Sequence, residues 1–104
     1  MSHFKYLKEK LFIENTSVLN IAKKNKTPFY LYSENQIKEN YLNFAKNFKN
    51  INPLICFAAK ANTNLTIMRM LGKLGSGADV VSGGELLKAL KAGIKPNKIV
   101  FSGV

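Results

Sequence analysis

The second half of the chain alternates short apolar runs with amphipathic segments, and this alternation limits the possible folds more than any other feature. Residues 54–60, 77–82 and 99–102 have the composition of strands. Between them, residues 65–74 and 86–92 place apolar side chains at helical spacing. A β-α-β-α-β order with short connections predicts an α/β fold with a parallel sheet, either doubly wound or a barrel.

The first half of the chain predicts one further strand and two helices. Residues 28–32, PFYLY, are aromatic and apolar as strands prefer. Ser33 and Gln36 have the spacing of a capping box, and apolar side chains follow at helical spacing. Residues 17–24 predict a short helix in an otherwise polar stretch.

Lys60 is the first candidate functional residue, because it follows the apolar run Leu54–Ala59 where the pattern changes from strand to turn. The carboxyl ends of strands are where α/β barrels place their chemistry. A neutral lysine amine is a nucleophile, and its commonest use is a Schiff base with a carbonyl compound or pyridoxal phosphate. The alternative is a solvent-exposed lysine that only ends the strand.

Asp79 is the second candidate, because strand alternation places it on the strand beside the one that carries Lys60. A carboxylate there can pair with the lysine or hold a positive charge of a cofactor. A polar group satisfied inside a barrel is equally consistent with the sequence. The small residues Ala58, Ala59 and Ala61 leave room for a flat aromatic cofactor.

Composition and charge restrict the partners and the compartment. The chain has 16 Lys and Arg against 6 Asp and Glu, a net charge of +10. The lysines are spread along the chain, so we expect no nucleic-acid partner, although a basic binding module is the non-enzymatic alternative. A single cysteine, no signal peptide and no long apolar run predict a cytoplasmic protein without membrane contact. We expect no metal.

Three blocks carry a resemblance to a known family: PLICFAAKANTN at 53–64, GSGADVVSGGEL at 75–86 and KIVFSGV at 98–104. They resemble the N-terminal part of the fold-type III, alanine-racemase-like decarboxylases that use pyridoxal phosphate. The style of the second and third blocks favours the branch that acts on meso-diaminopimelate. Phe57 and Ala59 stand where tyrosine and valine are commoner in the family.

The resemblance implies the N-terminal part of a pyridoxal-phosphate-binding (β/α)8 barrel, incomplete in this chain. Residues 33–104 would be the first part of that barrel, and residues 1–32 would pack with a C-terminal β-domain beyond the chain. Lys60 matches the lysine that carries the cofactor, Asp79 an aspartate near it, and Ser82 and Glu85 a conserved S-x-x-E. Family members are usually homodimers.

The implied reaction is decarboxylation of meso-diaminopimelate to L-lysine and CO2, the last step of lysine biosynthesis. Ornithine, arginine and carboxynorspermidine decarboxylases share the lysine block and remain alternatives. The phosphate-binding and substrate-binding residues of the family would lie beyond Val104. We therefore expect residues 1–104 alone to be inactive.

Overall fold

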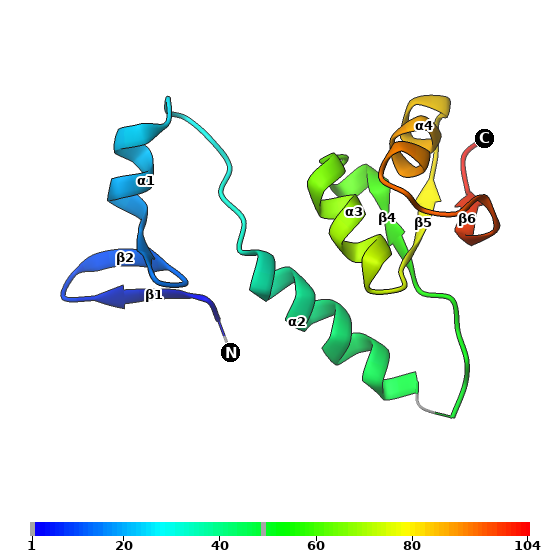
Figure 1. The fold of residues 1–104 in the computed structure, drawn as a ribbon, viewed down its shortest axis with the longest axis horizontal. Helices are drawn as coiled ribbons and strands as arrows, with labels where there is room; N and C mark the ends of the chain where they lie inside the picture. Colours follow the sequence, from blue (N-terminus) through cyan, green and yellow to red (C-terminus); the bar gives the residue numbers. More distant parts are fainter. Residues whose placement is uncertain (1, 49) are drawn as a thin grey trace. The chain divides into compact units, whose positions relative to one another are not determined.

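The structure, a computed structural model, describes residues 2–48 and 50–104 (Figure 1). The chain divides into two compact units, one reaching to Asn40 and one extending from Tyr41 to Val104. The long helix α2, Glu34–Ala45, begins in the first unit and ends in the second. Each unit has its own three-stranded sheet.

The first unit contains an antiparallel sheet that the sequence did not reveal. Its strands are β1 (Phe4–Leu7), β2 (Lys10–Ile13) and β3 (Thr16–Ser17), followed by helix α1 (Val18–Lys24). Lys8 and Glu9 form the turn between β1 and β2, with φ angles of 46° and 66°. Two-residue hairpin turns with positive φ are usually built from Asn and Gly, so this pair gave no turn signal.

The start of α2 is capped, but only half of the predicted capping box forms. The Ser33 hydroxyl accepts a hydrogen bond from the Gln36 amide at 3.0 Å, as predicted. The Gln36 side chain instead accepts from the His3 amide at 2.9 Å. The Glu14 carboxylate accepts from the Ser33 hydroxyl at 2.9 Å and from the Asn35 amide at 3.3 Å. These bonds tie the sheet of the first unit to the first turn of α2.

Between the two helices, the predicted strand at 28–32 is wrong, whereas the predicted helix at 17–24 is confirmed as α1. Residues 28–32 pair with no strand of the described chain, so no ladder hydrogen bonds hold them in a sheet. Tyr30 is 89% exposed and stacks against Tyr32. Aromatic composition alone therefore misidentified an unpaired segment.

The second unit has the predicted β-α-β-α-β order (Figure 1). Its sheet has the order β4-β5-β6, and both pairs are parallel. All three strands are shorter than predicted, and β4 ends at Ala58 because the chain turns into a short 3-10 helix directly after it. The elements after α2 are η1 (Lys46–Phe48), β4 (Cys56–Ala58), η2 (Ala59–Ala61), α3 (Leu65–Lys73), β5 (Gly77–Val80), α4 (Gly83–Lys91), η3 (Pro96–Lys98) and β6 (Ile99–Phe101).

One face of this sheet packs against α3 and α4 and forms the core. Ala78 and Val80 on β5 are fully buried, together with Met68 of α3 and Ala89 of α4. Side chains alternate along a strand, so Asp79 and its register partners Ala58 and Val100 lie on the opposite face. We call that opposite side of the β4-β5-β6 sheet the open face.

A substitution at Gly77 tests the close packing of the three strands. A Cβ at this position would lie 2.3 Å from the carbonyl oxygen of Lys98 and 2.8 Å from Cys56 Sγ. We expect Gly77→Ala to lower the free energy of unfolding of the full-length protein by at least about 2 kcal/mol, measured by urea denaturation. Gly83→Ala is the matched control, because nothing lies within 4 Å of its Cβ. Equal stability of the two variants would contradict the packing.

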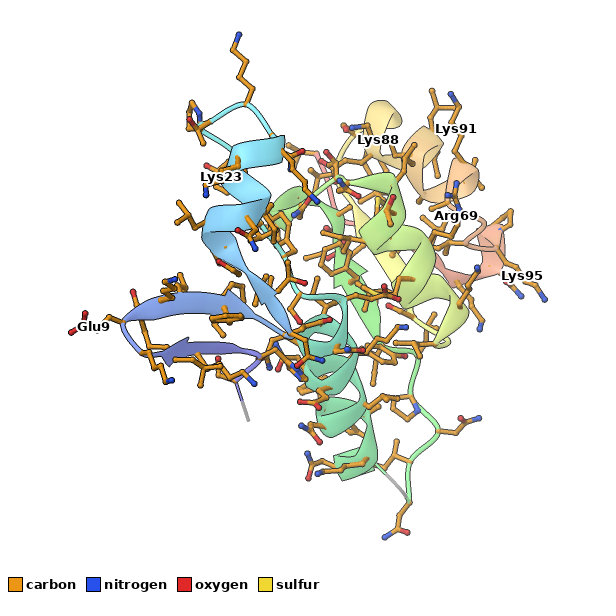
Figure 2. All side chains as sticks on the ribbon, turned by 60° about the vertical axis from the view of Figure 1, so that its left-hand side comes forward. Glu9, Lys23, Arg69, Lys88, Lys91 and Lys95 are labelled. Carbon is orange, nitrogen blue, oxygen red and sulfur yellow. The ribbon has the colours of Figure 1, made fainter. Side chains whose placement is uncertain are left out.

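A second prediction concerns the pKa of Glu14, which its hydrogen bonds with Ser33 and Asn35 hold below the ordinary value of 4.5. The stabilisation is complete above the unfolded value and is lost as the pH falls through the lower folded pKa. Glu14→Gln should therefore reduce hydrogen-exchange protection at the start of α2 at neutral pH, and the difference from the wild type should shrink on acidification. Glu9→Gln is the control, since Glu9 projects from the β1–β2 turn (Figure 2). A difference independent of pH would contradict this assignment.

Candidate cofactor site

The carboxyl ends of β4, β5 and β6 form one edge of the second unit, and the candidate residues gather there. Parallel pairing sets Ala58 opposite Asp79, and Asp79 opposite Val100. Lys60 follows two residues after Ala58, in η2. The sequence predicted that the strand before Asp79's strand is its neighbour, and the pairing of β4 with β5 confirms it. The prediction that Lys60 itself lies on the strand is wrong, because β4 ends at Ala58 and Lys60 lies in η2.

Lys60 is exposed and stands on a turn that is anchored on both sides. Ala59, just before it, is 0% exposed and belongs to the core, which fixes the end of β4. After it, the Asn62 amide donates to the Ala59 carbonyl at 3.1 Å, and Asn64 caps α3 by accepting from the amides of Thr66 and Ile67. The backbone of Lys60 is thus held while its side chain stays accessible.

Asp79 is half-buried and is hydrogen-bonded to a residue that sequence reasoning missed. Its Oδ1 accepts a hydrogen bond from the Ser102 hydroxyl at 2.5 Å. Within the described residues, no acidic oxygen lies within 4.0 Å of the Lys60 amine, so Asp79 and Lys60 form no ion pair here. Strand alternation along β6 was the signal available for Ser102, since it has the same parity as Val100.

Cys56 lies on the open face two residues before Ala58. Burial raises the pKa of its thiol, and the negative charge of Asp79 raises it further. The Cys56 thiol also contacts the Lys98 carbonyl at 3.9 Å. This cysteine therefore favours its neutral form and serves as a small packing group.

The loop after β5 is fixed by two hydrogen bonds at the start of α4. The Ser82 hydroxyl accepts from the Glu85 amide at 3.2 Å, and the Glu85 carboxylate accepts from the Val81 amide at 3.1 Å. Ser82 and Glu85, the S-x-x-E pair of the sequence, thus form the serine half of a capping box, whereas the glutamate reaches one residue further back than a capping box requires. Gly83 and Gly84 place no side chain at the edge of the open face.

The residues on the open face fit a flat cofactor with an aldehyde. Lys60 offers an accessible primary amine, Asp79 offers a carboxylate with one oxygen hydrogen-bonded to Ser102, and Ala58, in register with Asp79, has a small side chain. In the part of the chain that is described, no three His, Cys, Asp or Glu side chains gather as metal ligands. A primary amine near a carboxylate suits covalent attachment of an aldehyde to the amine.

The outer surface of α3 and α4 is basic. Figure 2 shows Arg69, Lys88, Lys91 and Lys95 projecting outward from these helices and the turn that follows. The Arg69 guanidinium donates to the Lys91 carbonyl at 3.5 Å, and the Lys88 amine donates to the Thr63 hydroxyl at 3.1 Å. Lys88 thereby contacts the turn that follows Lys60, whereas Arg69 makes no hydrogen bond to Lys60 or Asp79 within the described residues.

Residues 34–104 match the family model described as the pyridoxal-binding domain of pyridoxal-dependent decarboxylases. The chain belongs to this family. The match includes β4, β5, β6 and the residues at their carboxyl ends. The predicted fold class, the first part of a pyridoxal-phosphate-binding barrel, is confirmed by this match and by the solved structures that share the fold. Pyridoxal phosphate is the cofactor of the family.

Several proteins that are similar to this chain are named diaminopimelate decarboxylase. The enzyme of Helicobacter pylori J99 is 62% identical over 79 residues, which are 76% of this chain and 20% of that protein. The crystal structure of the M. jannaschii enzyme superimposes with a TM-score of 0.91 at 41% identity, over 97% of this chain and 25% of that one. The H. pylori enzyme complexed with L-lysine has a TM-score of 0.78 at 55% identity, over 83% and 22%.

The chain thus spans about a fifth to a quarter of the length of these relatives. The lysine complex shows that a related protein binds a small amino acid. In the described residues, no helix combines the length and the apolar character that a bilayer crossing requires.

Removal of the Ser82 cap should weaken α4 and the loop that leads into it. We expect Ser82→Ala to lower the free energy of unfolding of the full-length protein by about 1 kcal/mol, because the Glu85 amide loses its partner. Ser82→Asp keeps an acceptor at the helix start and should retain most of the stability. Urea denaturation midpoints distinguish the two variants, and identical losses would contradict a capping role.

Proposed function

We propose that the full-length protein containing this chain is a pyridoxal-phosphate-dependent decarboxylase that converts meso-diaminopimelate to L-lysine and CO2. The observation that carries the proposal is the accessible Lys60 amine at the carboxyl end of β4, inside the segment matched by the pyridoxal-binding domain. Relatives named diaminopimelate decarboxylase, at up to 62% identity, support the choice of substrate.

In this proposal the residues of the chain hold the cofactor and exchange it with substrate. Lys60 would hold the cofactor through its amine, and after the substrate amine displaces it Lys60 would be free to carry a proton near the reacting carbon. Asp79 places negative charge beside the cofactor from the neighbouring strand. When bound, pyridoxal phosphate supplies the electron sink that stabilises the negative charge left on the substrate carbon as CO2 departs.

The remaining features of the protein are proposals on the same basis. We propose a homodimer located in the cytoplasm, without a nucleic-acid or membrane partner. Within the full-length protein, residues 1–32 would pack with a C-terminal β-domain, and residues 33–104 would form the first part of the barrel. The structure divides the chain into two compact units at Asn40. That division reflects contacts within residues 1–104, so the packing of residues 1–32 with a further domain stays a prediction.

Other substrates and a non-enzymatic role are the competing interpretations. Ornithine, arginine and carboxynorspermidine decarboxylases would use the same lysine and the same strands. In the alternative of a non-enzymatic binding module, a polyanion would bind the basic surface formed by Arg69, Lys88, Lys91 and Lys95. The family match supports the enzyme over the binding module.

Product analysis with the full-length protein distinguishes these interpretations. The protein is supplied with pyridoxal phosphate and, in parallel, with meso-diaminopimelate, ornithine, arginine or carboxynorspermidine. Formation of L-lysine and CO2 from the first alone is the expected result. Turnover of another substrate would move the protein to a different branch of the family, and no turnover with any of the four would contradict the proposed activity.

The role of Lys60 has a test of its own. Lys60→Ala should remove the visible absorbance that the bound cofactor shows and reduce activity at least about 1,000-fold, because the attaching amine is lost. Lys91→Ala is the matched control, since Lys91 projects from the outer surface of α4 (Figure 2) and should leave both readouts unchanged. Absorbance and activity that survive in Lys60→Ala would overturn the assignment.

A further inference from the structure

The hydrogen bond from Ser102 to Asp79 links two strands at the edge where Lys60 stands. Ser102 follows β6, and its amide donates to the Val80 carbonyl at 3.0 Å, which fixes its backbone beside β5. From that position its hydroxyl donates to Asp79 Oδ1 at 2.5 Å. The backbone and the side chain of Ser102 are therefore both attached to β5.

This bond attaches the Asp79 carboxylate to a residue on the β6 side of the sheet. Asp79 is in register with Ala58 on β4 and with Val100 on β6, so its side chain lies between the two outer strands. Ser102 holds one carboxylate oxygen on the β6 side. Lys60 follows β4, on the other side, and in the described structure the two side chains form no ion pair.

We propose that Ser102 is a positioning residue that keeps the Asp79 carboxylate turned away from Lys60, so that the lysine amine is available for covalent attachment of an aldehyde cofactor. The inference rests on the proposed function of Lys60. It assigns to Ser102 a role that the candidate residues identified from the sequence did not include.

The physical reason is the effect of a nearby carboxylate on an amine. An opposite charge within about 4–6 Å favours the protonated form of lysine. A protonated amine has no lone pair, whereas the neutral amine attacks the aldehyde carbon, forms a carbon–nitrogen bond and releases one water. A carboxylate free to swing toward Lys60 would therefore raise the pH needed for attachment.

The other ionisable groups around Asp79 are unable to replace Ser102. Cys56, on β4, has a thiol that burial keeps neutral, and its sulfur contacts the Lys98 carbonyl. Lys98 lies at the register level of Gly77, at the opposite end of the sheet from Lys60. The Glu85 carboxylate is engaged with the Val81 amide.

The test uses full-length protein freed of cofactor and then titrated with pyridoxal phosphate across a pH series, with visible absorbance as the readout. Ser102→Ala should raise the midpoint pH for attachment by about 1 unit, because the freed carboxylate pairs with Lys60. Ser102→Thr keeps a hydroxyl and should retain the wild-type midpoint. Ser102→Cys donates weakly and should shift the midpoint in the same direction as alanine.

The double variant Ser102→Ala with Asp79→Asn separates this role from general damage to the fold. Removing the charge of Asp79 should return the midpoint toward the wild-type value. An unchanged midpoint in Ser102→Ala and Ser102→Cys, or a shift that persists in the double variant, would overturn the proposal. If the wild-type protein loaded with pyridoxal phosphate shows no visible absorbance that is lost in Lys60→Ala, the proposed function is contradicted, and with it this inference.

Discussion

The close approach of three strands at Gly77 is the constraint on which the second unit depends. A side chain at this position would collide with the Lys98 carbonyl oxygen at 2.3 Å, so the sheet requires a residue without Cβ. Once the strands are this close, parallel pairing places Ala58, Asp79 and Val100 in one row across the sheet. The position of Asp79 relative to the end of β4 follows from that row.

Because side chains alternate along a strand, one face of the sheet packs against the helices and the other carries the polar candidate residues. Val80 and Ala78 face α3 and α4 and are fully buried, which provides the apolar contacts that hold the strands. Asp79, between them in sequence, faces the other way and can carry charge without entering the core. The same alternation brings Ser102 to the side of Asp79, and the hydrogen bond between them orders the carboxylate.

The sequence predicted the second unit well and the first unit poorly, for physical reasons. The regular alternation of apolar runs identified β4, β5 and β6. The end of the first apolar run made Lys60 the candidate residue, and its role stays a prediction. The β1–β2 hairpin was missed because Lys8 and Glu9 adopt positive φ without the usual turn residues. Residues 28–32 were wrongly predicted as a strand because composition does not show whether a pairing partner exists. Ser102 was missed because its role depends on contact across strands.

The central claim is that Lys60 is the residue to which pyridoxal phosphate is attached. The most direct measurement is borohydride reduction of the cofactor-loaded full-length protein, followed by trypsin digestion and mass spectrometry of the peptides. Reduction makes the attachment permanent and blocks cleavage at the modified lysine. The account predicts one labelled peptide that runs from Asn50 to Arg69 with the label on Lys60. A label on any other lysine, with Lys60 cleaved normally, would contradict it.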